Sequence, residues 1–430
     1  MTRRSPYDRE ILRLAVPALG ALAAGPLYVL ADTAIVGHLG TPQLAALALA
    51  TTLVTGLIEV ADFLSYGTTA QVARLHGAGE HDRAGGLAAQ ALWLALGTGV
   101  LAAGLVLVLA APATSVLGGN GHVAHLTVTY VRIVALGVPF MLVALAGEGF
   151  LRGVSDLRTP LVILVAANAA NVVLEVLFVY GFGWGLAGSA AGTVIAQLAM
   201  GVAFAVRMLR APADDRRPSP ARMRPLVQMG GHLTVRTLAL LGAFTLASAL
   251  AARISTAALG AHQIAFQLFL FLALVLDAIA IAGQIIVARS LGRGAAGEAV
   301  DAARRMLVWA TVAGIGFAAA LLATIDLVPH AFTDDPAVIA QAQGIWPLFA
   351  LMQPAAAIVF ALDGILIGAG DTRYLAWAMV ASFAVFTPIA LAAKDLRVLW
   401  FGLLALMGVR LLTTAARFAG RRWVVVGAEA

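Results

Sequence analysis

Long apolar stretches recur along the whole chain of 430 residues. A helix needs about 20 such residues to cross roughly 30 Å of hydrocarbon. Twelve stretches of that kind are predicted: 11–37, 43–73, 87–111, 126–149, 159–180, 187–208, 225–252, 258–288, 303–327, 337–367, 374–393 and 398–418. Hydrophobic residues make up 61% of the chain and charged residues only 12%, and the alternation typical of membrane barrels is missing. We therefore predict an all-α integral membrane protein with twelve transmembrane helices.

The two halves of the chain repeat one another. A shift of 215 positions, half of the 430 residues, superposes rare charged and proline residues without a gap: Asp62 on Asp277, Pro139 on Pro354, Glu148 on Asp363, Asp156 on Asp371 and Arg158 on Arg373. Each half holds six predicted spans, so both enter the membrane in the same sense. This predicts two six-helix lobes, 1–209 and 225–430, related by a pseudo-twofold axis along the membrane normal. The stretch 210–224 is expected to be a plain, solvated cytoplasmic linker.

Basic residues indicate the orientation. Most of the 28 Lys and Arg residues fall at the two ends of the chain, including Arg3 and Arg4, and in alternate loops. By the positive-inside rule both termini are cytoplasmic, which agrees with an even number of spans. The net charge of +6 is thus a topology signal, and we expect the lipid bilayer and no nucleic acid as a partner. The expected location is the plasma (cytoplasmic) membrane.

Carboxylates interrupt the apolar stretches. Seven are found there: Asp32, Glu59, Asp62, Glu148, Glu175, Asp277 and Asp363. An ionised carboxylate near the bilayer centre costs at least a few kcal/mol, so such residues face a partner or a water-filled cavity and mark a substrate or ion path. The first hypothesis is therefore a transporter.

The first half holds the sharpest polar constellation. Tyr28 and Asp32 lie one helical turn apart in stretch 11–37, and Asn168, Asn171 and Glu175 form one polar stripe in stretch 159–180. Thr193 could approach the same space. The second half has no equivalent, since the shift places Ala247 on Asp32, Phe386 on Asn171 and Ala390 on Glu175. Coupling chemistry is therefore predicted in the first lobe only.

Several strings resemble those of the multidrug and toxic compound extrusion (MATE) family and, more narrowly, its DNA-damage-inducible F (DinF) branch. They are "LADTAIVGHLG" at 30–40, "LSYGTTAQVARLHGAG" at 64–79, "LRGVSDLRTP" at 151–160, "NVVLEVLFVYGFGWGLAGSAAGTVIAQ" at 171–197 and "DGILIGAGDTRY" at 363–374. The resemblance implies a two-lobe antiporter that expels organic, often cationic, compounds in exchange for H⁺ or Na⁺, without a cofactor.

The resemblance also implies a coupling-cation site at Asp32, Asn171, Glu175 and Thr193, with Tyr28 adjoining. Na⁺ could bind at Asp32, Asn171, Glu175 and Thr193, and no metal site is predicted with certainty. Glu175 stands where family members commonly have Asp, so the carboxylate lies one methylene further from the backbone. The alternative is a buried hydrogen-bond network that only locks the helices together.

A proton is the favoured coupling ion. Burial and a second carboxylate nearby favour the protonated form of one member of the Asp32 and Glu175 pair, which would titrate as a unit. Pro17 and Pro26 each remove a backbone hydrogen bond from stretch 11–37 and permit bending. In proteins similar to this one the first helix bends, and Pro17 matches the family's proline. For Pro26 a static kink is the alternative.

Other charged residues divide between two roles. Glu59, Asp62 and Tyr66 share a helical face and are candidates for lining the central cavity or a proton path, as are Arg236 and Asp277. Because Asp62 repeats as Asp277, the alternative is that these acids cap or pin helices in both lobes. A structural role is expected for Glu148 and Asp363. Arg236 needs a carboxylate partner that the sequence does not identify.

Three function classes follow. A secondary antiporter of small organic substrates, acting as a monomer, is best supported. A lipid-linked saccharide flippase would be expected to have a more cationic cavity, whereas only Arg132 and Arg236 are predicted within spans away from the cytoplasmic ends. An enzyme is least expected, because the sequence has no cysteine and no HExxH, P-loop or GxSxG motif.

Overall fold

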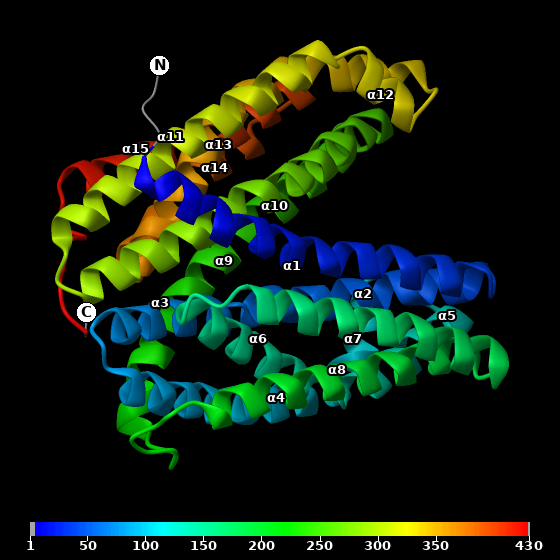
Figure 1. Ribbon diagram of the computed structural model, residues 1–430. Coiled ribbons are helices and arrows are strands. Elements are labelled where there is room, and N and C mark those ends of the chain that lie inside the picture. Colours follow the sequence, from blue (N-terminus) through cyan, green and yellow to red (C-terminus); the bar gives the residue numbers. More distant parts are fainter. Residues whose placement is uncertain (1–4, 429–430) are drawn as a thin grey trace. The chain divides into compact units, whose positions relative to one another are not determined.

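The computed structural model describes residues 5–428, in which every regular element is a helix (Figure 1). Arg3 and Arg4, which the charge pattern counted at the N-terminus, lie outside the described residues. The elements are α1 Pro6–Gly37, α2 Thr41–Ala61, α3 Phe63–Gly77, α4 His81–Val116, α5 Gly121–Ala135, α6 Val138–Gly153, α7 Arg158–Val176, the π-helical turn η1 Leu177–Gly181, α8 Gly185–Arg210, α9 Pro220–Ile254, α10 Thr256–Gly292, α11 Ala296–Ala323, α12 Leu327–Phe332, α13 Pro336–Gly368, α14 Thr372–Leu391 and α15 Leu396–Ala419.

The helices agree with the predicted membrane spans. Within residues 5–428, eleven helices are long and apolar enough to cross a membrane, and the bent pair α5 and α6 makes a twelfth if it counts as one span. The two members of that pair meet at 52°, because the chain turns at Gly137 and a proline opens α6. Its counterpart in the second half, α13, continues through Pro354 as one helix. The prediction of an all-α membrane protein is confirmed.

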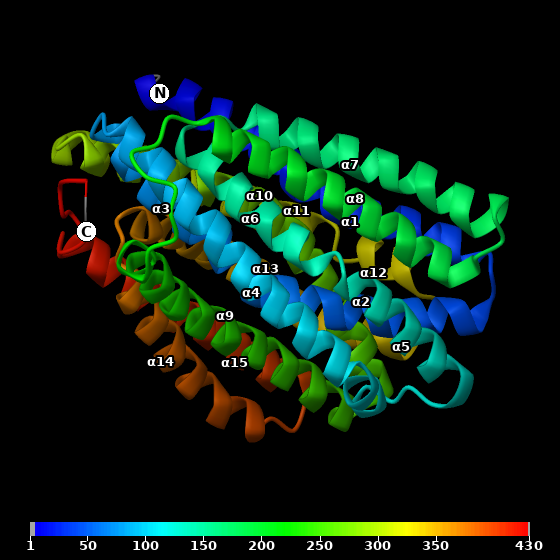
Figure 2. The same cartoon turned by 90° about the horizontal axis from the view of Figure 1, so that it is seen from below.

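The chain forms two compact units. The N-terminal unit comprises Gly20–Gly230, and the C-terminal unit comprises Met1–Leu19 and Gly231–Ala430. In the N-terminal unit α6 packs against α3, α4 and α8; in the C-terminal unit α13 packs against α10, α11 and α15 (Figures 1 and 2). The single helix α1 therefore contributes to both units, and Pro17 lies close to the boundary.

The internal repeat is visible in matching close contacts. A Cβ added to Gly149 would lie 2.5 Å from the carbonyl oxygen of Ser65, and one added to Gly364 would lie 2.2 Å from that of Ala280. The second pair corresponds to the first after a shift of 215 positions, which takes Gly149 to Gly364 and Ser65 to Ala280. Small residues let membrane helices approach until their backbones touch. The same helix contact thus builds each unit.

Buried arginines depart from the sequence analysis. Arg74, Arg152 and Arg410, which are among the basic residues on which the predicted cytoplasmic ends and loops rest, lie within helices and are buried. Arg152 pairs with Glu148 one turn earlier on α6 and donates to the hydroxyl of Ser65 at 3.2 Å. A buried arginine is tolerated where a carboxylate neutralises it, so the structural role expected for Glu148 has a partner.

The beginning of α1 is fixed within the C-terminal unit. Asp8 accepts two hydrogen bonds from Arg305 on α11, at 2.6 and 2.7 Å, and a third from the indole of Trp309 at 2.9 Å. Glu10 pairs with Arg289 on α10. A bidentate contact between Arg and a carboxylate fixes direction as well as distance. The first turns of α1 are therefore held by α10 and α11.

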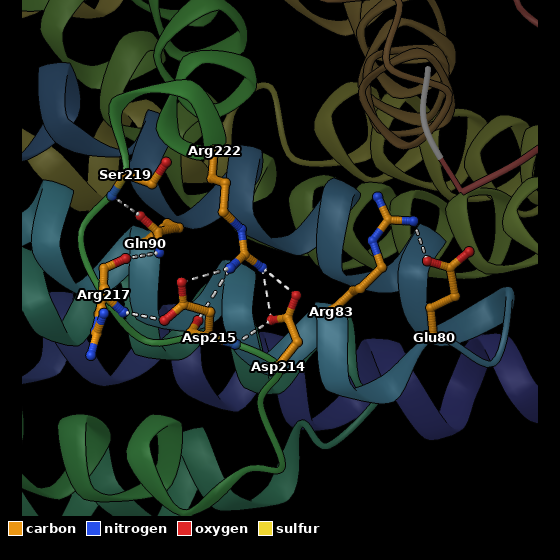
Figure 3. Close-up of polar contacts among 8 residues, drawn as sticks. All are labelled: Glu80, Arg83, Gln90, Asp214, Asp215, Arg217, Ser219 and Arg222. Carbon is orange, nitrogen blue, oxygen red and sulfur yellow. Dashed lines mark hydrogen bonds and ion pairs between the residues drawn. The ribbon is translucent and has the colours of Figure 1, made fainter.

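The linker 210–224 is exposed but is not a free tether, because its backbone is fixed to α4 (Figure 3). Gln90 donates to the carbonyl oxygen of Arg217 at 2.8 Å and accepts from the backbone N–H of Ser219 at 2.9 Å. The indole of Trp93 donates to the carbonyl oxygen of Arg216 at 2.9 Å. The side chain of Gln90 is fully buried. Its two hydrogen bonds to the linker backbone are therefore shielded from water and hold the linker against α4.

A second contact closes the linker on itself. One nitrogen of Arg222 donates to both carboxylate oxygens of Asp214 at 2.7 Å (Figure 3). Partial burial acts to raise the pKa of Asp214, but the hydrogen bonds from Arg222 and from backbone amides outweigh it and lower that pKa below its usual range. A Cβ at Gly86 would lie 2.0 Å from the Asp214 carboxylate. Only glycine on α4 leaves room for this pair.

Candidate functional site

A hydrogen-bonded network joins α1, α7 and α8 in the N-terminal unit. The phenol of Tyr28 on α1 donates to Oε1 of Glu175 on α7 at 2.7 Å and lies 3.0 Å from the hydroxyl of Thr193 on α8. Thr193 is also 3.5 Å from Oε1 of Glu175. Three side chains from three helices thus meet around one carboxylate oxygen.

The second carboxylate is held by a residue that the sequence analysis missed. Ser189 on α8 donates to Oδ1 of Asp32 at 2.9 Å, and its own carbonyl oxygen accepts from the hydroxyl of Thr193 at 3.1 Å. Asp32 and Glu175 interact electrostatically. The signal for Ser189 was its position one turn before Thr193 on a helix rich in Gly and Ala. Ser189 therefore links the two carboxylates through α8.

The two asparagines of α7 take different places. Asn168 donates to the carbonyl oxygen of Ala24 at 2.9 Å and so ties α7 to α1. Asn171 is buried, and its Oδ1 has no hydrogen-bond partner among residues 5–428. The same holds for Oε2 of Glu175. A buried acceptor without a partner is costly, so these two oxygens are the free acceptors of the network.

Close approach of α8 to α7 depends on Gly192. A Cβ at this position would lie 3.2 Å from Oδ1 of Asn171 and 3.3 Å from Cγ of Glu175. Those distances are shorter than ordinary van der Waals contacts, so a larger residue would press on both side chains. The missing side chain therefore places the two free acceptors beside α8.

The acidic groups of the site are the two carboxyl groups of Asp32 and Glu175. Asp32 is 5% exposed and Glu175 is fully buried, and the described hydrogen bonds to both come from hydroxyl groups, none from an arginine or lysine. Two buried carboxylates without a base cannot both carry a charge at small cost. In the described part of the chain no three His, Asp or Glu side chains gather as a metal site. The oxygen atoms present suit a proton and also Na⁺.

The two hinge candidates lie within one continuous helix, α1, on either side of the boundary between the compact units. Pro17 is half-buried in the C-terminal unit, and Pro26 is exposed in the N-terminal unit. Tyr28 and Asp32 follow Pro26 within two turns. A bend at either proline would therefore act on the helix that carries the network.

The other candidates belong to other helices than the three that form this network. The predicted continuous helix 43–73 is divided at Asp62, where α2 ends and α3 begins, and Tyr66 follows one turn later while Glu59 is exposed. α2 and α3 pack against α5 and α6. Asp277 is half-buried on α10 of the C-terminal unit. Their proposed role in a cavity or proton path stays a prediction.

The carboxylate partner that the sequence predicts for Arg236 is Asp363. Its guanidinium donates to Oδ2 of Asp363 at 2.5 Å, and Arg410 donates to the same oxygen at 2.6 Å. All three lie in the C-terminal unit, on α9, α13 and α15. Asp363 thus accepts from two arginines, whereas its repeat mate Glu148 pairs with Arg152, and its structural role stays a prediction.

Known proteins resemble this chain in sequence and in fold. The sequence profile of the family described as MatE matches residues 17–177 and 233–392. The Arabidopsis thaliana protein named "Protein DETOXIFICATION 44, chloroplastic" is 33% identical over 96% of this chain and 82% of its own length. "DNA damage-inducible protein F" of Escherichia coli (strain K12) is 28% identical over 97% of this chain and 93% of its own.

The solved structure titled "Crystal structure of MATE in the bent conformation" matches with a TM-score of 0.89 at 20% identity, over 97% of this chain and 96% of that one. The likeness to a solved structure shows the fold, and the family profile covers both halves. The DinF branch remains a prediction, since the plant protein is more similar than the DinF protein. The chain is a multi-pass membrane transporter and belongs to the MATE family.

Proposed function

We propose that this protein is a secondary antiporter of the cytoplasmic membrane that exports organic, often cationic, compounds in exchange for protons. The observation that carries the proposal is the pair Asp32 and Glu175, which is buried on two helices and accepts hydrogen bonds from the hydroxyls of Tyr28, Ser189 and Thr193. Such a pair holds a proton readily and releases it when its surroundings change. The second half has alanine at both mate positions, so exchange is assigned to the N-terminal unit.

Alternating access would follow from movement of α1. Protonation removes the charge of one carboxylate and changes the hydrogen bonds that Tyr28 and Ser189 make to the pair. Because α1 is fixed at its start by α10 and α11 and further along by the network with α7 and α8, a change at the network bends α1 at Pro17 or Pro26. The proton would thus bias a two-state helix.

Membership of the MATE family supports an efflux role, and the positive-inside pattern supports cytoplasmic termini. The free acceptors Asn171 Oδ1 and Glu175 Oε2 would also suit Na⁺. We favour the proton because the longer side chain of Glu175 allows its carboxylate to lie close to Asp32.

The test is transport into inside-out proteoliposomes that hold the purified protein. Ethidium serves as the fluorescent cation, with either a pH gradient at equal Na⁺ or a Na⁺ gradient at equal pH. Accumulation driven by the pH gradient alone, with none from Na⁺, is expected. Accumulation that follows the Na⁺ gradient at zero pH gradient would overturn proton coupling, and failure of both would count against ethidium export.

A further inference from the structure

The linker 210–224 and the end of α8 carry a basic surface that the transport mechanism does not use. Residues 207–224 contain six arginines and two aspartates, and both aspartates, Asp214 and Asp215, lie near Arg222, at 2.7 and 3.9 Å. The other five arginines are exposed, and within residues 5–428 none of them pairs with a carboxylate: Arg207, Arg210, Arg216, Arg217 and Arg224. Positive charge therefore prevails on this surface.

The linker runs along one face of α4, away from the start of that helix. The backbone N–H of Asp214 donates to the carbonyl oxygen of Asp82 in the first turn of α4, at 3.1 Å. Two residues later, the carbonyl oxygen of Arg216 accepts from the indole of Trp93 at 2.9 Å. Because Trp93 lies about three turns beyond Asp82, the linker carries Arg216 and Arg217 towards the apolar part of α4.

The face of α4 that the linker reaches continues as an exposed apolar stripe. Trp93 is 45% exposed. Further exposed positions follow it at helical spacing: Gly97, Val100, Gly104 and Val108. α4 is one of the helices long and apolar enough to cross a membrane, and tryptophan is enriched at the level of the lipid headgroups. Arg216 and Arg217 therefore lie at the border between the polar and the apolar surface of the N-terminal unit.

The last turn of α8 brings two more arginines to this border. One guanidinium nitrogen of Arg216 donates to the carbonyl oxygens of Leu209 and Ala211, at 3.1 and 2.8 Å, and so fixes the linker to the end of α8. Arg210 stands between these two residues in the chain, and Arg207 precedes it by three positions, which places both on adjoining parts of the helix surface. The basic groups are thus held by two helices, α4 and α8.

We propose that Arg207, Arg210, Arg216 and Arg217, together with Trp93, form a binding site for the phosphate group of an anionic phospholipid. A guanidinium matches a phosphate with two parallel hydrogen bonds, and the exposed side chain of Arg217 points away from the other labelled residues (Figure 3). Trp93 and the apolar stripe beyond it would contact the acyl chains. This contact favours a lipid over a nucleic acid or a free phosphate ion. The site is independent of the ion that drives transport.

Two lipids with equal acyl chains test the role of charge. Purified protein in detergent is incubated with dioleoyl phosphatidylglycerol or dioleoyl phosphatidylcholine at constant ionic strength, and native mass spectrometry gives the apparent Kd of the first lipid bound. Each arginine near an anionic lipid contributes about fivefold, so phosphatidylglycerol should bind at least about tenfold more tightly than phosphatidylcholine. Equal affinity for the two lipids would overturn the site.

Two soluble probes identify the source of the phosphate. Glycerol 1-phosphate carries the phosphate without acyl chains, and inorganic phosphate is the ion alone. Both should bind at least about tenfold more weakly than phosphatidylglycerol, because neither has apolar groups to place against Trp93 and the apolar stripe. Binding of either probe as tight as that of phosphatidylglycerol would overturn the assignment to a lipid.

A charge-matched pair of variants locates the site. Arg216→Gln with Arg217→Gln removes two charges and should weaken the binding of phosphatidylglycerol at least about tenfold, while phosphatidylcholine binding stays unchanged. Arg421→Gln with Arg422→Gln is the control, because it also removes two adjacent exposed arginines, after the end of α15, and should bind phosphatidylglycerol as the wild type does. Equal losses in the two double variants would show that only the total charge matters and would refute the site.

Two further variants separate a fixed site from loose attraction. Gln90→Ala keeps every arginine but removes two bonds that hold the linker on α4, so it should weaken phosphatidylglycerol binding several-fold. Wild-type affinity in Gln90→Ala would refute the docked arrangement. Should the Arg216 and Arg217 double variant lose thermal stability, Arg217→Gln alone replaces it, because the side chain of Arg217 is exposed. Wild-type affinity in Arg217→Gln as well would refute the site.

Discussion

The phenol of Tyr28 donates a hydrogen bond of 2.7 Å to Glu175, which lies 147 positions later in the chain. This single contact joins the first helix to the C-terminal end of α7, and Thr193 on α8 lies 3.0 Å from the same phenol oxygen. The position of α1 is therefore connected directly to a carboxylate that is fully buried. Any change in the protonation of Glu175 must change the bond that Tyr28 makes.

Replacing Tyr28→Phe should lower pH-driven efflux by about tenfold, because it deletes one hydrogen bond to a buried, ionisable group without changing the shape of the ring. Transport is measured in proteoliposomes at equal protein content. The matched control is Tyr180→Phe, since Tyr180 also donates to α1 but to the backbone carbonyl of Ile35. Equal losses in the two variants would show that the phenol of Tyr28 has no special part.

Glu175→Gln and Ala390→Ser compare the two halves at mate positions. Glutamine keeps the size of Glu175 but cannot release a proton, so efflux should fall to background. Ala390 is fully buried within the apolar core of the C-terminal unit, and a serine hydroxyl there can bond back to its own helix, so efflux should change little. Comparable losses at equal membrane abundance would argue against coupling in one unit only.

Glycine substitutions separate packing at the site from general helix stability. Gly192→Ala should reduce both efflux and thermal stability, because the added Cβ presses on Asn171 and Glu175, and overpacking of this kind costs roughly 1–3 kcal/mol. Gly97→Ala on α4 meets no atom within 4 Å and should leave both unchanged or raise stability slightly. Thermal unfolding monitored alongside transport checks this, and a harmless Gly192→Ala would contradict the close contact.

The linker should open when its hold on α4 is removed. Gln90→Ala deletes two hydrogen bonds to the linker backbone, each worth about 1 kcal/mol, so the open population should rise roughly 5–30-fold. Trypsin cleavage after Arg216 measures this opening. Unchanged cleavage in Gln90→Ala, with wild-type folding, would show that other contacts hold the linker.

Acid should loosen the same segment. The pKa of Asp214 is lowered in the folded protein, so its contact with Arg222 stabilises the docked linker above the ordinary aspartate pKa of about 3.9, and this contribution is lost as the pH falls through the lowered value. Hydrogen exchange of the linker amides, corrected for the intrinsic effect of pH, should speed up below about pH 4. In Asp214→Asn this acid effect should vanish.

Much of the fold could be predicted from the sequence because its signals are long. Each apolar stretch extends over about twenty residues. The break between α5 and α6 could not be predicted in this way, because Pro139 and Pro354 occupy equivalent positions in the two halves but only Pro139 begins a new helix. For the site, Tyr28, Asp32 and Glu175 were found because polar residues spaced by helical turns stand out in apolar helices.

The missed features depend on how helices are rotated against one another, which one sequence does not reveal. The sequence places Asp363 in an apolar stretch and predicts a carboxylate partner for Arg236, yet their pairing depends on the positions of α9 and α13. Ser189 stands among glycine and alanine residues, so its sequence position hardly indicates that its hydroxyl bonds to Asp32. The hold of Gln90 on the linker leaves no pattern, because its bonds go to backbone atoms whose residue types do not matter.

Asp32→Asn tests the switch itself. Asparagine is nearly isosteric and cannot titrate, and removing a buried charge should leave folding intact or slightly improved. The variant should still bind ethidium in detergent but fail to export it against a gradient. Near-normal export would remove Asp32 from the mechanism and make Glu59 and Asp62 the next candidates.

Proton release on substrate binding tests the central claim most directly. Ethidium is added to purified protein in weakly buffered, sodium-free detergent solution near pH 7, and a pH indicator follows the protons set free. We predict that the wild type releases protons in proportion to the ethidium bound, and that Asp32→Asn and Glu175→Gln bind ethidium with little or no release. Binding by the wild type without any proton release, or undiminished release by both variants, would contradict proton exchange at Asp32 and Glu175.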